Sequence, residues 1–186
     1  MDALLARYAE LVRLWSERLD LVSPVDLARF EERHIRDSLR LLPLFDDLPE
    51  GHCADVGSGA GLPGIPLAIS TPRHWRLLEP RKNRAAFLEE VVRELDLDCE
   101  VLVMTAEQAA TRPALAAGHA LVTARALADP PAAFGLILPL AAPGGRAVVW
   151  HGPEAQLPGE AEDWTPGIAT IEVPREPAEG GGLPAR

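Results

Sequence analysis

The chain begins with an amphipathic pattern. Apolar side chains recur every three or four residues over the first twenty positions, as they do along the buried face of an α-helix. We therefore predict a helix over residues 2–20, whose buried face carries Leu4, Tyr8, Leu11, Trp15 and Leu19.

A second helix is predicted to begin after Ser23. Ser23 is a suitable N-cap, Pro24 suits the first helical position, and Asp26 lies in the first turn, where an acidic side chain is favourable. One face of this helix carries Leu27, Phe30, His34, Ser38 and Leu42. The sequence "LPEG" ends it, so residues 1–50 are predicted to form an N-terminal helical extension.

From residue 52 the pattern changes to short apolar runs that alternate with amphipathic segments. Five alternations of this kind predict an α/β fold with a mostly parallel, Rossmann-like sheet, covered by helices on both faces. We expect the strand order 3-2-1-4-5. The strands are predicted at 52–56, 74–79, 99–104, 119–124 and 145–150. The helices are predicted at 63–70, 83–97 and 129–142, with a short helix or loop at 106–115.

The last part of the chain differs from this core. Residues 51–152 form the predicted core, and residues 153–186 are rich in Pro, Gly and Glu. Only "IATIEV", at 168–173, has the pattern of a strand, so residues 153–186 are expected to contain a partial terminal strand. The final acidic stretch, "EPAEGGGLPAR", is predicted to be largely disordered.

The net charge of −10 argues at first against a nucleic-acid partner. However, residues 151–186 carry 2 basic and 7 acidic side chains and so supply half of the excess. Residues 73–93 hold six basic side chains and only three acidic ones. Two interpretations stay open for this stretch: a local basic face, or an ordinary solvated helix surface.

Other features bound the class of protein. No apolar run approaches the ~20 residues that span a bilayer, and the charged N-terminus is not that of a signal peptide. We expect a soluble cytoplasmic monomer without a membrane partner. Cys53 and Cys99 are the only cysteines, and with no CxxC pair they predict neither a metal site nor a disulfide.

The stretch "DVGSGAGLPG", residues 55–64, joins the first predicted strand to a helix and contains four glycines. Such a loop lets a ligand approach bare backbone. Gly59, Gly61 and Gly64 spell GxGxxG, and Glu79 follows Gly59 by 20 residues. This spacing is typical of dinucleotide sites, but many nucleoside-binding sheets share it.

Three features favour S-adenosylmethionine over NAD. Asp55, at the tip of the first strand, suits the ammonium group of a methionine moiety and would repel a pyrophosphate. Ala106 and Glu107 follow the third strand, where they are placed to meet an adenine edge, while Glu79 suits ribose hydroxyls. The element "LAAPGGRAVVW", read as a helix, a tight Pro-Gly-Gly turn and a strand, resembles the one that closes the parallel sheet of class I methyltransferases.

Several longer motifs carry a more specific resemblance. The matching pieces are "Y…LVRLW", "RHIRDSL", "DVGSGAGLPGIPLAI", "LLEPRKNRAAFLEEVVREL", "AE", "TARALA" and "APGGRAVV", which together span roughly four fifths of the chain. The chain resembles the bacterial small-subunit (16S) ribosomal RNA guanine-N7 methyltransferases, a family also called glucose-inhibited division protein B (GidB, RsmG). The resemblance implies a class I S-adenosylmethionine-dependent methyltransferase that acts on small-subunit ribosomal RNA or on the assembled small subunit.

The resemblance also places the cofactor contacts. The family's contacts map onto Gly57 and Leu62 in the loop, Ala106 and Glu107 after the third strand, and Arg125 after the fourth. Arg125 has the alternative role of capping a strand end.

Guanine N7 carries a lone pair and no proton, so the reaction needs no general base. The enzyme has to hold N7 in line with the methyl–sulfur bond and exclude water. The candidate residues for positioning the substrate are His34, Asp37, Arg125 and His151. His34 and Asp37 belong to "RHIRDSL", where His34 is otherwise a capped, partly buried histidine.

The chain departs from the family at four positions. The family usually has Asn and Thr where Asp20 and Val22 stand, Arg in place of Thr105, and Lys in place of His151. The last two would be cations near the RNA, so their replacement predicts weaker RNA binding with unchanged cofactor binding.

Alternative functions remain at this stage. "ADPPAAF" resembles the acid-Pro-Pro-aromatic motif of amino-methyltransferases, although Ala132 stands where the aromatic should be and Asp129 is explained more simply as an N-cap. The others are a methyltransferase of another substrate, a cofactor- and RNA-binding protein with little turnover, and, last, an NAD oxidoreductase.

Overall fold

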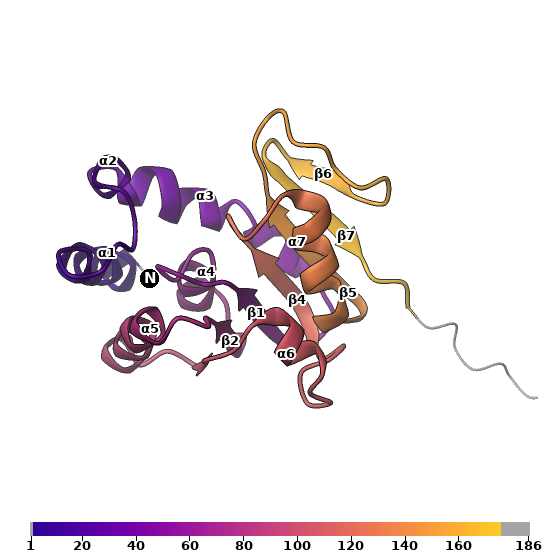
Figure 1. Cartoon of the computed structure of the whole chain (residues 1–186), viewed down its shortest axis with the longest axis horizontal. Helices are drawn as coiled ribbons and strands as arrows, with labels where there is room; N and C mark the ends of the chain where they lie inside the picture. Colours follow the sequence, from indigo (N-terminus) through magenta and orange to yellow (C-terminus); the bar gives the residue numbers. More distant parts are fainter. Residues whose placement is uncertain (1, 176–186) are drawn as a thin grey trace, which may run out of the picture.

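The computed structural model describes residues 2–175, and these form a seven-stranded sheet with helices on both faces (Figure 1). The strand order is β3-β2-β1-β4-β5-β7-β6. The first five strands pair in parallel and the last two antiparallel. The strands are β1 (His52–Val56), β2 (Trp75–Leu78), β3 (Cys99–Leu102), β4 (His119–Ala124), β5 (Ala141–Trp150), β6 (Glu162–Thr165) and β7 (Ile168–Glu172). The predicted order 3-2-1-4-5 is therefore confirmed.

The helices divide between the two faces of the sheet. Helices α4 (Gly64–Ser70) and α5 (Lys82–Leu95) cover one face, and α1 (Asp2–Ser16) packs on both of them from outside. Helices α6 (Ala106–Ala110) and α7 (Pro130–Ile137) cover the other face, followed by a 3₁₀ turn at Leu138–Leu140. Alternate strand residues face opposite cores because side chains alternate along a strand.

The second N-terminal helix is not continuous, which corrects the prediction. It is divided into α2 (Pro24–Leu27), a π-helical turn at Glu31–Ile35, α3 (Arg36–Leu39) and a 3₁₀ turn at Leu42–Asp46. The N-cap is as predicted, since the Ser23 side chain accepts a hydrogen bond from the Asp26 amide. Phe30 and Ile35 are both buried although five residues apart. A π turn brings such a pair to one face, which an α-helix does not.

Strand β5 also differs from the predicted helix, turn and strand. It starts at Ala141, before the Pro-Gly-Gly segment, and its pairing with β4 is irregular there, because Ala141 lies opposite His119 and Arg146 lies opposite Leu121. Here the β4 backbone comes very close, because a Cβ on Gly145 would stand 2.8 Å from the His119 carbonyl oxygen. A glycine-containing strand that permits close approach of its neighbour gives the same sequence pattern as a turn.

The C-terminal part is more complete than predicted. Strand β7 pairs with β5, and β6, which was not predicted, pairs with β7, so the described residues contain two antiparallel strands where one partial strand was expected. The predicted disordered stretch, residues 176–186, lies outside the described residues. Within residues 2–175, no helix combines the length and apolarity required to cross a membrane. Cys53 and Cys99 are free and lie on non-adjacent strands.

Candidate active site

The glycine-rich loop lies at the carboxyl end of β1, before α4. Its path requires glycine, because φ is +71° at Gly57, +55° at Gly59 and +91° at Gly61, values that L-residues rarely adopt. Ligands of open parallel sheets bind at this edge, outside the carboxyl ends of the strands.

Two buried carboxylates hold the loop in place. Asp55 Oδ2 accepts a hydrogen bond from the Gly64 amide at 3.3 Å, and Oδ1 accepts one from Thr123 Oγ1 at 2.8 Å. Glu79, at the end of β2, accepts hydrogen bonds from the Gly59 and Arg81 amides, both at 2.9 Å. The carboxylates therefore fix the loop to the first, second and fourth strands.

Both predicted acids are buried and already hydrogen-bonded within the protein. Asp55 is fully buried, both of its oxygens accept hydrogen bonds, and burial raises its pKa to about 6. Glu79 is also buried, with both oxygens engaged. Because two carboxylate oxygens offer about four acceptor sites, the predicted contacts of both acids with a ligand stay proposals.

The helical extension contacts the loop directly. Tyr8 of α1 is fully buried and donates a hydrogen bond from its hydroxyl to the Ala60 carbonyl oxygen at 2.7 Å. A Cβ on Gly61 would stand 3.2 Å from the same hydroxyl. The sequence indicated Tyr8 only as one apolar position of a helix, and nothing in its spacing distinguished this anchor from a packing residue.

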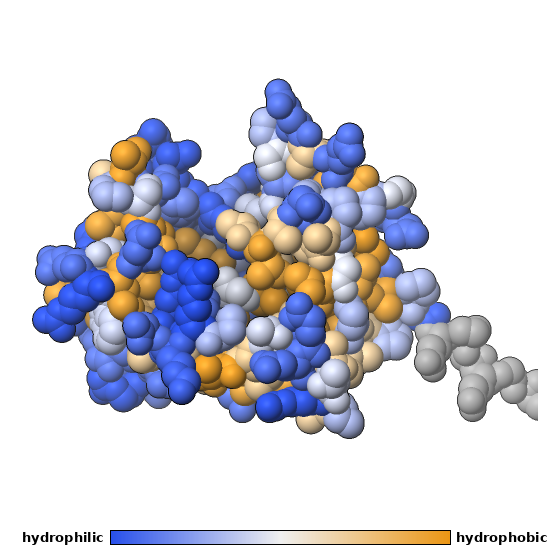
Figure 2. Space-filling model, viewed as in Figure 1, coloured by the Kyte–Doolittle hydropathy of each residue, from blue (hydrophilic) through white to orange (hydrophobic). Residues whose placement is uncertain are grey.

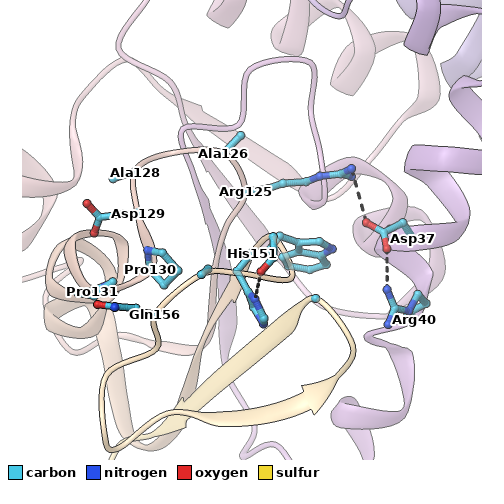
Figure 3. A pocket seen from close by; sticks show the side chains of 14 residues that line it. Asp37, Arg40, Arg125, Ala126, Ala128, Asp129, Pro130, Pro131, His151 and Gln156 are labelled. Atoms are coloured by element: carbon cyan, nitrogen blue, oxygen red, sulfur yellow. Dashed lines mark hydrogen bonds and ion pairs between the residues drawn. The ribbon is translucent and has the colours of Figure 1, made fainter.

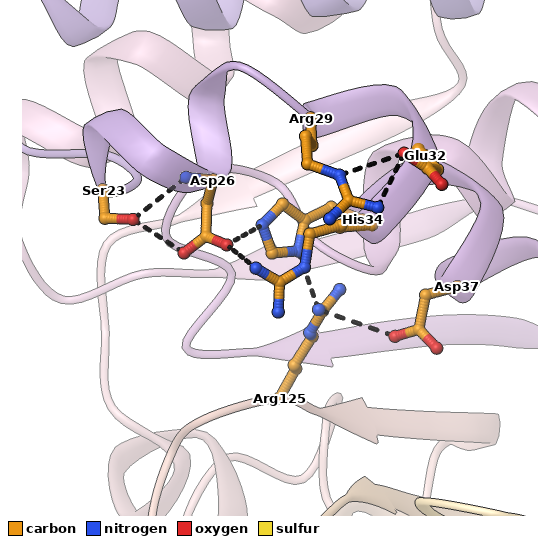
Figure 4. Close-up of polar contacts among 8 residues, drawn as sticks. Ser23, Asp26, Arg29, Glu32, His34, Asp37 and Arg125 are labelled. Carbon is orange, nitrogen blue, oxygen red and sulfur yellow. Dashed lines mark hydrogen bonds and ion pairs between the residues drawn. The ribbon is translucent and has the colours of Figure 1, made fainter.

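A cluster of charged side chains lies beside the loop, between α3 and the end of β4 (Figure 4). One guanidinium nitrogen of Arg125, Nη2, stands 2.8 Å from His34 Nδ1 and 3.5 Å from Asp37 Oδ2. The other, Nη1, is buried without a hydrogen-bond partner among the described residues. The structure thus brings together three of the predicted positioning residues, 91 positions apart in the case of His34 and Arg125.

The contacts fix the protonation state of His34. A guanidinium only donates hydrogen bonds, so Nδ1 accepts from Arg125 and the neutral ring carries its proton on Nε2. Burial, and then the charge of Arg125, lowers the pKa of His34 below 6.5. Nε2 has no hydrogen-bond partner among residues 2–175, and its nearest acid is Asp26, 3.7 Å away.

A large cleft opens beside this cluster. It has a volume of about 890 Å³ and is walled by α3, the start of α7, and the end of β5 with the β6–β7 turn (Figure 3). The surface is hollowed between the N-terminal helices and this C-terminal part (Figure 2). Arg40 joins the two walls, since it pairs with Asp37 at 2.8 Å and donates to the Pro166 carbonyl at 2.7 Å.

A second, smaller cavity of about 180 Å³ lies against the glycine loop. Its lining includes Gly57, Gly59, Leu62 and His34. It shares Arg125 with the large cleft, together with Ala126, so the two cavities meet at the end of β4.

The predicted residues after β3 lie at the sheet edge but outside both cavities. Ala106 and Glu107 begin α6, where Ala106 is buried and Glu107 is exposed. Thr105 forms a capping box with Gln108, so the residue that replaces the family's arginine stabilises a helix start.

His151 lies in the wall of the large cleft but is not a free cation. Its side chain is only 7% exposed, and its ring nitrogens contact Asp163 at 3.0 Å and the Gly152 carbonyl oxygen at 2.9 Å. Both Thr105 and His151 are engaged within the fold, and the weaker RNA binding expected from the loss of the family's two cations stays a prediction.

Asp129 is an N-cap, as the simpler alternative predicted. Its side chain accepts a hydrogen bond from the Ala132 amide at 3.0 Å. The acid of the "DPPA" segment is therefore occupied, which argues against the amino-methyltransferase interpretation.

Most of the basic residues between 73 and 93 are engaged within the chain. Four of the six have partners within the chain, namely Arg73 with Pro49, Arg76 with Glu100, Arg84 with Asp20 and Arg93 with Glu90. In the described residues, the side chains of Arg81 and Lys82, at the start of α5, form no hydrogen bond or ion pair.

Sequence reasoning missed Thr123, Arg40 and Trp150. Thr123 is a polar residue in a strand that is otherwise almost wholly apolar, a signal that could have marked it as a partner of Asp55. Arg40 and Trp150 join the site through packing between segments more than 100 residues apart, which no local pattern reveals.

Comparisons with known proteins agree with this architecture. The family model described as rRNA small subunit methyltransferase G matches residues 1–165. The ribosomal RNA small subunit methyltransferase G of Acidiphilium cryptum is 44% identical over 167 residues, covering 86% of this chain and 73% of the relative. That of Granulibacter bethesdensis is 40% identical, with the same two coverages.

Among solved structures, a putative S-adenosyl-L-methionine-dependent methyltransferase of Methanococcus maripaludis shares the fold. Its TM-score is 0.55 at 19% identity, over 77% of this chain and 62% of that one. The match over nearly the whole described chain, together with the glycine loop and its strand order, leads to one conclusion: the chain belongs to the rRNA small subunit methyltransferase G family (GidB).

Proposed function

We propose that this protein transfers a methyl group from S-adenosylmethionine to N7 of a guanine in small-subunit ribosomal RNA. The observation that carries the proposal is the junction of the two cavities. A small cavity against bare glycine backbone meets a large cleft at Arg125, so a cofactor and a base have separate places with a common border.

The residues present fit S-adenosylmethionine in chemistry. Gly57 and Gly59 offer bare backbone, Leu62 offers an apolar contact, and Glu79 has acceptor capacity for ribose hydroxyls. Ala106 and Glu107 stand at the next strand end, where the adenine is proposed to lie. When bound, the cofactor supplies a methyl group on a positively charged sulfur.

The cavity against the loop is smaller than the ~300–1,000 Å³ of ordinary small-molecule sites. Leu127 contributes to this, because its Cδ1 stands 2.9 Å from the place of a Cβ on Gly57. We infer that the segment after β4 shifts away from Gly57 when the cofactor binds.

The residues of the site position groups rather than transfer protons. Guanine N7 reacts through its lone pair, and neutral His34 is not required as a base. Arg125 is fixed by His34 and Asp37, so its buried Nη1 is held ready to donate to a substrate oxygen. Orientation of this kind, with exclusion of water, is a recognised source of rate enhancement.

We also propose that the protein acts in the cytoplasm as a monomer, on the RNA or on the assembled small subunit. Arg81 and Lys82, at the start of α5, are candidates for phosphate contacts, each of which would change the salt slope of binding by roughly 0.7–0.9.

The test is incorporation of a labelled methyl group from S-adenosylmethionine into small ribosomal subunits that lack the modification, followed by digestion and mass analysis of nucleosides. We expect 7-methylguanosine in the small-subunit RNA. Label in another nucleoside would indicate a methyltransferase of a different specificity. Cofactor binding without any label would favour a binding protein with little turnover.

A further inference from the structure

The large cleft contains a donor and an acceptor side by side in one wall. Arg125 and Asp37 face each other there, and Pro130 and Pro131 lie on the opposite side (Figure 3). Trp150 lines the same cleft. Flat apolar groups around a charged pair are suited to a planar ligand with polar edges, such as a nucleobase taken out of its stack.

Two guanidinium groups hold the Asp37 carboxylate in place. Arg40 Nη1 lies 2.8 Å from Oδ1, and Arg125 Nη2 lies 3.5 Å from Oδ2. The side chain is 23% exposed, so the carboxylate is reachable from the cleft while its orientation is fixed.

The order of these groups along the site matches the order of groups on guanine. Asp37 lines only the large cleft, Arg125 lines both cavities, and Gly57 lines only the small one. Around the guanine ring, the N2 amino group and N1–H come first, then O6, then N7. The N–H donors of guanine thus face the Asp37 carboxylate, and O6 faces the Arg125 guanidinium. N7, the atom to be methylated, faces the glycine loop.

We propose that Asp37 reads guanine by accepting hydrogen bonds from N1–H and the N2 amino group, while Arg125 donates to O6 and N7 points to the cofactor. This specificity role rests on the proposed function. It also gives the buried Arg125 Nη1 the partner that it otherwise lacks among the described residues.

The same pair disfavours adenine. Adenine presents an unprotonated N1 to the Asp37 carboxylate and an amino group to Arg125, which sets acceptor against acceptor and donor against donor. A site whose polar groups are left unpaired by the wrong ligand discriminates strongly, because buried unpaired groups are costly.

The test combines removal of Asp37 with removal of one guanine group. The modified position is first mapped with the unaltered protein. Small subunits are then reconstituted with ligated RNA that carries guanosine or inosine at this position. Inosine keeps N1–H, O6 and N7 and lacks only the N2 amino group.

The unaltered protein should prefer guanosine over inosine in kcat/KM by about tenfold to a hundredfold, the range of one charge-assisted hydrogen bond. In Asp37→Ala this preference should fall to about one. In Asp37→Asn, which keeps one acceptor, it should be intermediate.

Two further variants distinguish recognition of guanine by Asp37 from a purely structural role of its ion pair. Arg40→Gln breaks the same ion pair but keeps the carboxylate, so the guanosine preference should persist whatever the overall rate. Glu32→Gln, an exposed acid of the same helical segment paired with Arg29, should leave both rate and preference unchanged. Affinity for S-adenosylhomocysteine shows that each variant retains the cofactor site.

The outcomes distinguish the two proposals. If the unaltered protein makes no 7-methylguanosine, the proposed function fails. If it makes 7-methylguanosine but shows no preference over inosine, or if Asp37→Ala keeps the full preference, the assignment of Asp37 is overturned while the proposed function stands.

Discussion

The two cavities that meet at Arg125 are built in opposite ways. Around the glycine loop, the anchoring polar groups are paired within the protein: Asp55 with Thr123 and Gly64, Glu79 with two amides, and Tyr8 with a carbonyl. Among the residues that line the large cleft, Arg125 Nη1 and Trp150 Nε1 are buried without hydrogen-bond partners in residues 2–175.

This difference separates two tasks. A loop whose anchors are satisfied has one stable shape and can present its backbone to a cofactor without rearranging. A wall with unpaired donors is incomplete on its own, and buried polar groups are normally paired. We infer that the loop reaches its final shape when the protein folds, whereas the unpaired donors of the cleft gain partners when the substrate binds.

The largest effect is expected from a substitution in the glycine loop. Gly59→Val forces a β-branched residue into φ +55°, although the nearest heavy atoms to the added Cβ are 3.6 Å away. The fold should therefore survive while affinity for S-adenosylhomocysteine falls by about a hundredfold or more. Calorimetry measures this, and Gly135→Ala, with nothing within 4 Å of its new Cβ, is the control. Unchanged affinity in Gly59→Val would mean that the ligand does not contact the loop.

The next largest effect is expected from a substitution of Arg125, which lines the large cleft. Arg125→Gln removes the charge shared by both cavities, and we expect RNA methylation to fall by about a hundredfold, the typical cost of losing one positioned donor. Affinity for S-adenosylhomocysteine should fall much less.

Because Arg125 lowers the pKa of His34, the same variant should raise that pKa, which an NMR titration of the histidine ring detects. A His34 pKa that stays at its original value would show that the two side chains are not coupled in solution.

The raised pKa of Asp55, an anchor of the loop, predicts that folding stability depends on pH. Its pKa is about 6 in the folded protein and about 3.9 in an unfolded chain. Between these values the folded state binds the extra proton, so stability falls as pH rises from about 4 to about 6 and then levels off.

The expected loss is at most about 3 kcal/mol, and Asp55→Asn should lack it. Denaturant titrations of both proteins at pH 4.5 and 7 measure the difference. A difference that stays constant with pH would show that Asp55 is ionised throughout.

A smaller effect is expected at the contact between the helical extension and the loop. Tyr8→Phe leaves the Ala60 carbonyl without its partner and should cost about 1–3 kcal/mol of folding stability, with a several-fold loss of cofactor affinity. Leu14→Ala, an exposed position of the same helix, is the control. Loss of stability with intact affinity would mean that Tyr8 supports the fold alone.

The smallest effect concerns Leu127, which covers Gly57. Shortening this side chain in Leu127→Ala should ease cofactor entry and raise affinity by about two- to threefold. Weaker binding instead would show that Leu127 holds the cofactor and does not have to move.

The sequence predicted those parts of the structure that depend on neighbouring residues. Short apolar runs and the amphipathic segments between them indicated the five parallel strands and their helices, and the glycines marked the loop. The resemblance to the methyltransferase family, drawn from "RHIRDSL" and "DVGSGAGLPGIPLAI", is confirmed.

What failed depends on distant parts of the chain. The π turn at Glu31–Ile35 arises because Phe30 and Ile35 pack against one core, and β5 continues through Gly145 because β4 approaches it. The inward turn of Asp55 follows from Thr123, 68 residues away. The contact of His151 with Asp163 joins β5 to β6, a strand that the sequence did not predict.

The central claim, that the loop binds the cofactor and the cleft reads the base, is tested most directly by one calorimetric series. Affinity for S-adenosylhomocysteine is measured for the unaltered protein, Gly59→Val and Asp37→Ala under identical conditions. The account predicts a loss of about a hundredfold or more in Gly59→Val and a change of less than about threefold in Asp37→Ala. Equal losses in both variants would contradict it, because the two regions would then form a single site.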